Sequence, residues 1–111
     1  MLDRVTGSLE HYLDLLTQRQ KIVASNIANA DTPGYKTRDL DFRSNFDNAL
    51  EQTAPRTTEV SGLAVKNDGN NVSLDREARL LAENSLRFNI ASNLLKGKLR
   101  MVKQAIQEGK S

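Results

Sequence analysis

The sequence predicts a mainly α-helical protein in which two long terminal helices pair as an antiparallel, coiled-coil-like hairpin joined by an irregular middle segment. Apolar residues recur at alternating spacings of four and three near both ends of the chain, which is typical of helices that pack along a seam. Only 5% of the 111 residues are aromatic and none is Trp, so Leu and Ala must supply most of the packing. One structural domain is expected, comprising a helix and turn over residues 1–35, a connection over 36–72 and a helix over 73–111.

The first helix is predicted from a seam that begins at Leu9. Its positions are Leu9, Leu13, Leu16, Gln20, Val23, Ile27 and Ala30, of which only Gln20 is polar. A helix of about 23 residues would span roughly 35 Å. It must end near Thr32, because Pro33 disfavours helical geometry in the residue before it and Gly34 tolerates the positive φ of a type II turn.

The second helix is expected from Leu74 to Gln107. Its seam comprises Leu74, Ala78, Leu81, Ser85, Phe88, Ser92, Leu95, Leu99, Val102 and Ile106. Ser73 is a suitable N-cap and Gly109 a suitable stop. Gly97 costs about 1 kcal/mol relative to Ala inside a helix, which is too little to break one with so many good helix formers.

The connection between the helices has the composition of a loop. Residues 53–71 are rich in Thr, Ser, Gly, Asn and Asp, with a short extended piece expected at Glu59 to Val65. So long a connection is unusual in a compact domain, which suggests that it is mobile or is ordered by a neighbour.

Both helices carry apolar residues that do not belong to the main seam. These are Leu15 and Ile22 in the first helix and Leu80, Leu86, Ile90, Leu94 and Met101 in the second. A hairpin of two helices hides one stripe of each, so a second apolar face requires further partners.

The distribution of charge along the chain favours an effect of the helix dipole over a nucleic-acid-binding surface. The net charge is +2, and in the last third of the chain Asp75, Glu77 and Glu83 come first, while the bases Lys96, Lys98, Arg100, Lys103 and Lys110 come later. This is the order that a helix dipole prefers, and the bases are not massed with aromatic residues as a nucleic-acid surface would require. The absence of Cys excludes disulfides and thiolate metal sites, and neither a secretory signal nor an apolar run of membrane-spanning length is visible.

A twelve-residue string at the end of the first helix resembles the signature of flagellar rod and hook proteins. It reads Ser25-Asn26-Ile27-Ala28-Asn29-Ala30-Asp31-Thr32-Pro33-Gly34-Tyr35-Lys36. Two further segments, Thr37 to Phe42 and Gly69 to Glu77, are similar to those of the proximal rod members of that family, as is the ending from Ala105 to Gly109. The loop from Thr53 to Asp68 is unmatched and shorter than is common in the family.

The resemblance implies a structural subunit of the flagellar basal body that transmits torque without catalysis. It implies partners among other rod proteins, further copies of the chain, a rod adaptor protein and the membrane-embedded rotor (MS) ring, with transient contact to the export gate. It also implies a place in the rod on the periplasmic side, reached without a cleaved signal peptide. No cofactor, metal, nucleic acid or small-molecule substrate is expected. The residues expected to form the assembly and turn motif are Asn26, Asn29, Asp31, Thr32, Pro33, Gly34 and Tyr35.

Three assignments have alternatives. Asn26 and Asn29 suit either bonds to the local backbone or contacts between subunits. Phe46 and Leu50 resemble the short Phe-x-x-x-hydrophobe signal for docking at the export gate, but a helical turn that places both on one face is the simpler explanation, and the two are compatible. His11 has no second ligand at metal spacing and is expected to be a surface residue.

The rival functions are a coiled-coil adaptor or export-apparatus partner, a membrane-surface helix and an enzyme. A generic coiled coil has no reason to carry the Thr-Pro-Gly-Tyr turn, and Asp14, Glu83 and Glu108 dilute any basic membrane-binding face. An enzyme would need converging carboxylates or an activated nucleophile in a shielded pocket, and the sequence predicts no such pocket.

Overall fold

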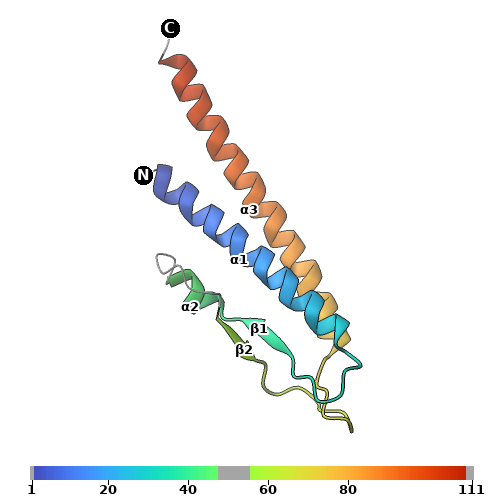
Figure 1. Ribbon diagram of the computed structural model, residues 1–111. Coiled ribbons are helices and arrows are strands. Elements are labelled where there is room, and N and C mark those ends of the chain that lie inside the picture. The colour runs from blue at the N-terminus through green and yellow to red at the C-terminus, as the bar shows by residue number, and fades with distance from the viewer. Residues whose placement is uncertain (1, 48–55, 110–111) are drawn as a thin grey trace.

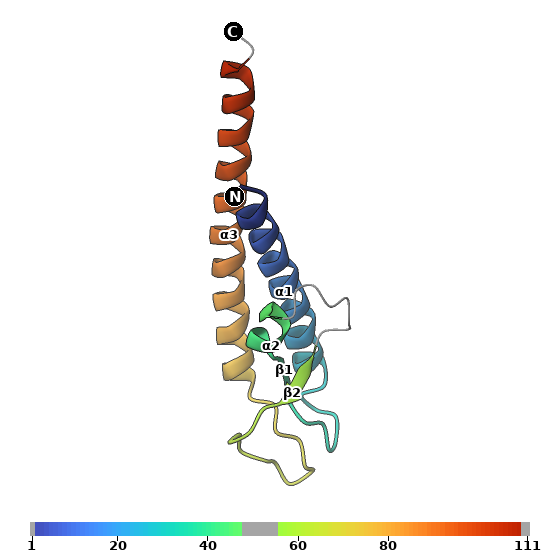
Figure 2. The ribbon, with the colours of Figure 1, turned by 90° about the vertical axis from the view of Figure 1, so that its left-hand side faces the viewer.

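The computed structural model describes residues 2–47 and 56–109 and shows an elongated hairpin of two helices (Figure 1). Helix α1 (Leu2–Ala28) runs antiparallel to helix α3 (Leu74–Glu108), which confirms the predicted fold class. The molecule measures 70 × 27 × 19 Å. With 27 and 35 residues, the helices span roughly 40 and 52 Å, and α3 extends beyond the start of α1 (Figure 2).

The ends of α3 follow from its capping residues. The Ser73 hydroxyl accepts a hydrogen bond from the backbone nitrogen of Arg76, and Asp75 and Glu77 lie in the first turn. At the other end, the backbone nitrogen of Gly109 donates to the carbonyl of Ala105. Helix α3 therefore matches the predicted range to within one residue.

The last turn of α3 contains no basic residue. Since the helix dipole acts mainly within the first and last turns, it accounts for the early acids but not for Lys96 to Lys103. The dipole explanation of these bases was therefore wrong, and their placement needs another reason.

The middle segment contains more regular structure than expected. Strand β1 (Arg38–Leu40) pairs antiparallel with strand β2 (Thr57–Glu59), with Arg38 opposite Glu59 and Leu40 opposite Thr57. Helix α2 (Phe42–Asp47) follows β1. The extended piece thus lies at 57–59 rather than from Glu59 to Val65, because pairing with β1, which is remote in sequence, selects it.

Helix α1 lies between α3 and the middle segment (Figure 1). The Phe42 ring of α2 meets Tyr12 edge to face, with 6.1 Å between the ring centroids, and the Arg19 guanidinium lies 5.3 Å from the centre of the same ring. His11, half-buried rather than fully at the surface, has its Nε2 3.0 Å from the Asn45 carbonyl oxygen. Leu15, which was expected off the seam, is only 3% exposed because it shares the stripe of α1 that the middle segment covers.

The buried interior is nearly half polar. Among the residues whose burial the structure describes, seven apolar ones are buried, namely Leu15, Leu16, Val23, Ala30, Leu40, Val72 and Ala91. Six polar residues are buried with them, namely Asn26, Thr37, Asn70, Asn71, Glu77 and Asn84. Because buried polar groups need partners, hydrogen bonds specify this hairpin as much as apolar packing does.

The predicted seam positions agree better with the buried residues on α1 than on α3. Leu16 and Val23 are buried, Leu9 and Leu13 are half-buried, and Ile27 is exposed. On α3, the buried residues are Glu77, Asn84 and Ala91, one position before the expected Ala78, Ser85 and Ser92. The other predicted positions are half-buried at Leu81, Leu95 and Val102 and exposed at Phe88 and Leu99.

This shift on α3 has a polar cause. Glu77 and Asn84 both find hydrogen-bond partners in α1, and a pattern of apolar residues cannot anticipate that preference. Across the described ranges, no helix combines the length and apolar character needed to cross a membrane.

Candidate assembly site

The predicted turn is locked by a second segment that lies just before α3. Gly34 has φ of +76°, as expected for the turn, and its backbone nitrogen donates to the carbonyl of Asp68. The Asn70 side chain is fully buried, and its Nδ2 donates to the carbonyls of Asn29 and Thr32 at 2.9 and 2.8 Å. A Cβ on Gly69 would lie 3.4 Å from the Cα of Gly34, so the two glycines permit a close backbone approach.

Asn71 extends this lock to the start of β1. Its Oδ1 accepts from the backbone nitrogen of Thr37 at 2.6 Å, and its backbone nitrogen donates to the carbonyl of Tyr35. Thr37 in turn donates through its hydroxyl to the Asn71 carbonyl. Two of the segments that carry the resemblance, Ser25 to Lys36 and Gly69 to Glu77, therefore bind each other. We call this arrangement the turn clamp.

Asn26 connects the turn clamp to both long helices. Its Oδ1 accepts from the Tyr35 hydroxyl at 2.9 Å and from the Arg38 backbone nitrogen at 3.2 Å. Its Nδ2 donates to the Arg38 carbonyl at 2.8 Å and to Oε2 of Glu77 at 3.2 Å. A single side chain, only 1% exposed, thus joins α1, the turn, β1 and α3.

A chain of charges runs beside Asn26. The Asp39 carboxylate accepts from Arg19 of α1 at 3.0 Å and from Arg76 of α3 at 3.2 Å. Arg76 also contacts Oε1 of Glu77 at 2.7 Å, and the Glu77 side chain is completely buried. The buried carboxylate is therefore paired and hydrogen-bonded, which is the condition under which a buried charge is tolerated.

The remaining residues of the turn motif have separate roles. Asn29 bonds the local backbone, because its Nδ2 donates to the Ser25 carbonyl, whereas Asn26 bonds other segments of the same chain. Tyr35 is half-buried, while Asp31, Thr32, Pro33 and Gly34 are exposed. The side chains at the tip of the turn are thus free to meet a neighbour, and their assembly role stays a prediction.

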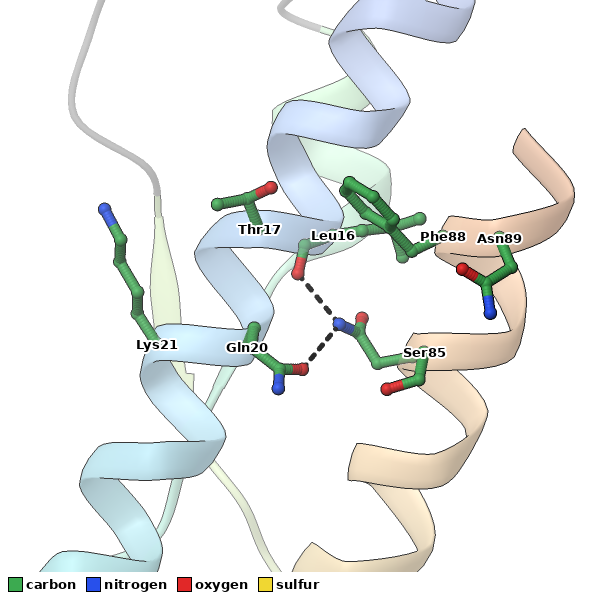
Figure 3. Close-up of a pocket in the computed structure, with 8 residues that line it drawn as sticks. Leu16, Thr17, Gln20, Lys21, Ser85, Phe88 and Asn89 are labelled. Atoms are coloured by element: carbon green, nitrogen blue, oxygen red, sulfur yellow. Dashed lines mark hydrogen bonds between the residues drawn. The ribbon is translucent and has the colours of Figure 1, made fainter. Parts of the chain in front are cut away.

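A groove of about 430 Å³ opens between α1 and α3 next to Leu16 and Phe88 (Figure 3). Asn84 lines this groove and is 3% exposed. Its Nδ2 donates to the Leu16 carbonyl at 2.9 Å and to Oε1 of Gln20 at 3.0 Å, while its Oδ1 has no hydrogen-bond partner in the described part of the chain.

Helix α3 presents apolar side chains to solvent on a face away from α1. Leu86, Ile90, Leu94 and Met101 are each more than half exposed, as the sequence predicted for residues off the seam. At the flank towards α1, Arg87 donates to Glu83 and to the Tyr12 hydroxyl. The Tyr12 hydroxyl and then the Glu83 carboxylate raise the pKa of Arg87 above its ordinary value, so this cation stays charged at any pH at which proteins fold.

The remaining predicted site cannot be placed in full. Phe46 belongs to α2, which agrees with a helical turn at that point, but its side chain and Leu50 lie outside the described residues. Within residues 2–47 and 56–109, no group of three or more His, Cys, Asp or Glu side chains is placed to hold a metal.

Sequence reasoning missed Asn70, Asn71, Glu77 and Asn84 as determinants of the structure. The sequence carried this information as polar residues beside apolar seam positions, and as the Asn pair Asn70-Asn71 two residues before the N-cap Ser73. It could not be interpreted because the partners of these side chains lie between 34 and 68 residues away in the chain.

A two-helix hairpin with a locked turn and a largely exposed second helix defines a class of structural proteins that pack into larger assemblies. The family model for flagella basal body rod proteins matches residues 13–36, which contain most of α1 and the turn. Among similar curated proteins, the flagellar basal body rod protein FlgB of Yersinia enterocolitica is 34% identical over 138 aligned positions, which cover 98% of this chain and all of the relative.

Two further FlgB proteins support the same conclusion. Those of Salmonella typhimurium and Escherichia coli K12 are 33% and 31% identical over 137 positions, which cover 98% of this chain and 99% of each relative. The chain belongs to the FlgB family of flagellar basal body rod proteins. It is accordingly a structural protein of the rod, located in the basal body and associated with other basal-body components.

The alignments contain more positions than the 111 residues of this chain, so these relatives carry residues that it lacks. The sequence places this shortening in the loop from Thr53 to Asp68, which remains a prediction.

Proposed function

We propose that this chain is a subunit of the proximal rod, the part of the drive shaft that carries torque from the rotor ring to the distal rod and hook. The observation that carries this proposal is the exposed apolar stripe of α3 in a member of a rod-protein family. A free-standing protein has no use for such a face, whereas a subunit in a packed tube buries it.

The turn clamp supports a mechanical role. Torque can pass through a subunit only if its two long helices keep their relative orientation under load. Here they are joined by buried hydrogen bonds from Asn26 and Asn84 and by the shared ion pairs of Asp39, rather than by a flexible linker alone. Buried hydrogen-bond networks such as the one around Asn26 rigidify the elements that they connect.

The proposed partners and route follow the family resemblance. The subunit packs against other copies, other rod proteins, a rod adaptor protein and the rotor ring on the periplasmic side. It reaches that position through the export gate without a cleaved signal peptide, with Phe46 and Leu50 as the docking motif. Of the predicted seam residues, the buried Leu16 and Val23 hold the hairpin together, and the exposed residues Asp31 to Gly34 meet neighbouring subunits.

Cryo-electron microscopy of purified basal bodies tests this proposal. We expect density at the base of the rod that fits two antiparallel helices joined by the turn at Asp31 to Tyr35. If the chain were found instead in a soluble complex, it would be an adaptor and the rod assignment would be wrong.

A substitution on the exposed stripe tests the same proposal in cells. Ile90→Asp should leave the purified chain folded, because Ile90 is 53% exposed, but should prevent its incorporation into basal bodies. Ala78→Asp is the matched control, since Ala78 is exposed on another face of α3. Equal incorporation of the two variants would contradict the assembly role of the stripe.

A further inference from the structure

The exposed stripe of α3 is continuous and well separated from the hairpin contact. Leu86, Ile90, Leu94 and Met101 are 60%, 53%, 55% and 58% exposed. At 3.6 residues per turn they fall within an arc of roughly 80°, centred about 120° from the line of buried residues formed by Glu77, Asn84 and Ala91. In Figure 1 no described element lies on the side of α3 that faces away from α1.

Gly97 lies on this same arc, between Leu94 and Met101. It is not among the glycines with positive φ, and a Cβ placed on it would meet nothing within 4 Å. No conformational or packing requirement within the described chain therefore explains a glycine inside this helix, where it weakens helix formation. A glycine in this position does permit the backbone of another helix to approach closely.

Basic residues flank the stripe between Glu83 and Glu108, two acidic residues that lie on the same arc just beyond its ends. Residues 84–107 contain five basic residues and no acidic one. Of these five, only Arg87 forms an ion pair within the described residues, and the helix dipole does not account for the other four because they precede the last turn. Lys96, Lys98, Arg100 and Lys103 thus surround Gly97 with unpaired positive charge.

We propose that this stripe docks an amphipathic helix with acidic flanks, supplied by another component of the basal body, whose backbone approaches α3 most closely at Gly97. The proposal rests on the proposed function, which requires α3 to be covered in the assembly. The apolar centre supplies contact area, Gly97 sets the crossing point, and the lysines and Arg100 select a partner of negative charge.

A second copy of this chain is a poorer occupant. Among the described residues, the large apolar side chains that are more than half exposed all belong to α3, with the exception of Val65. A second copy would therefore have to bring its own α3 stripe, and the two basic flanks would repel each other.

The test uses the purified full chain and two synthetic helical peptides with the same apolar stripe, one flanked by Glu and the other by Lys. Isothermal titration at low and at physiological salt should show that the Glu-flanked peptide binds at least about tenfold more tightly, with a preference that weakens as salt rises. Gly97→Leu should weaken this binding by about tenfold or more, because its side chain occupies the crossing point.

Matched variants make the result specific. Ala78→Leu adds the same side chain to an exposed face of α3 outside the stripe and should bind like the unmodified chain. Circular dichroism should show that Gly97→Leu keeps its helix content, since its Cβ meets nothing within the chain. Lys98→Glu combined with Arg100→Glu should reverse the preference towards the Lys-flanked peptide.

Equal binding of the two peptides, or full binding by Gly97→Leu, would overturn the inference. If the chain self-associates and Gly97→Leu abolishes this, the stripe binds a second copy. If the chain binds anionic vesicles in preference to the Glu-flanked peptide, the stripe binds a lipid surface. Either result would also overturn the inference. Cryo-electron microscopy of basal bodies distinguishes a failure of this inference from a failure of the proposed function. If the chain is found at the rod base but does not prefer the Glu-flanked peptide, only the inference is wrong. If the chain prefers the Glu-flanked peptide but is absent from the rod, the proposed function is wrong.

Discussion

At the residue scale, the geometry of this hairpin depends on a few buried amides. Asn26 contacts Tyr35, Arg38 and Glu77, so one side chain sets the positions of three other segments. Asn70 does the same for the turn by donating to two of its carbonyls. Asn70 lies in a stretch that composition assigns to a loop and Asn26 lies near the end of the first helix, yet both are fully or almost fully buried.

Replacing Asn26 by Ala should destabilise the chain by about 2–4 kcal/mol, because it removes four hydrogen bonds and leaves the buried Glu77 with Arg76 as its remaining partner. The loss should be measured as the change in unfolding free energy by urea denaturation followed by circular dichroism.

Asn29→Ala is the matched control for this substitution. Asn29 lies three residues further along, and its exposed bonds to Ser25 and Thr32 are local, so its loss should cost less than about 1 kcal/mol. Equal losses for the two variants would show that the turn clamp does not stabilise the isolated chain.

At the scale of elements, Asn84 fixes how α1 and α3 face each other. It lies seven residues after the buried Glu77 and seven before the buried Ala91, on the line of α3 that meets α1. A single polar residue in a helical seam typically specifies register at a cost in stability. Here the cost is visible as an Oδ1 that lacks a partner in the described chain.

Asn84→Leu should therefore raise the unfolding free energy by about 1 kcal/mol, because it removes an unpaired buried acceptor and adds apolar contact beside a groove that has room for it. The Leu16 carbonyl is not orphaned, since it lies inside α1 and keeps its helical partner. Urea denaturation should give the difference.

Asn84→Ala is the comparison variant, and it should be less stable than Asn84→Leu because it leaves a cavity. If the Leu variant proves to be the less stable of the two, the hydrogen bonds of Asn84 outweigh its unpaired oxygen and the interpretation is wrong.

At the scale of the whole molecule, stability should decrease along α3 from the turn clamp to its end. The clamp end is held by buried bonds, whereas the last turns of α3 extend past α1 and expose Leu99, Met101 and Ile106 (Figure 2). Regions with few buried contacts open at lower free energy.

Hydrogen exchange followed by mass spectrometry should consequently show slower exchange for amides of residues 77–91 than for those of residues 99–108, by about tenfold or more. Addition of the Glu-flanked peptide should slow exchange around Gly97 without changing the first group. Uniform protection along α3 in the isolated chain would mean that the helix is stable without a partner.

The periodicity of apolar residues was sufficient to predict both long helices, and capping residues placed the ends of α3 to within one residue. The same reasoning misplaced the extended piece, because β2 exists through its pairing with β1 rather than through its own propensity. It also chose Ala78, Ser85 and Ser92 where Glu77, Asn84 and Ala91 are buried, because a search for apolar positions treats a buried Glu or Asn as an outward-facing residue.

The sequence by itself determined the two helices, the sharp turn at Pro33 and Gly34 and the membership of a rod-protein family, because these depend on local conformational preferences and on a contiguous motif. Only the tertiary structure decided which residues join the helices, that the segment before α3 locks the turn, and that a side chain at Gly97 would meet nothing within 4 Å in the described part of the chain. Those features depend on contacts between residues that are distant in sequence, and the choice among such contacts is made by the pairing of buried polar groups, which no local pattern records.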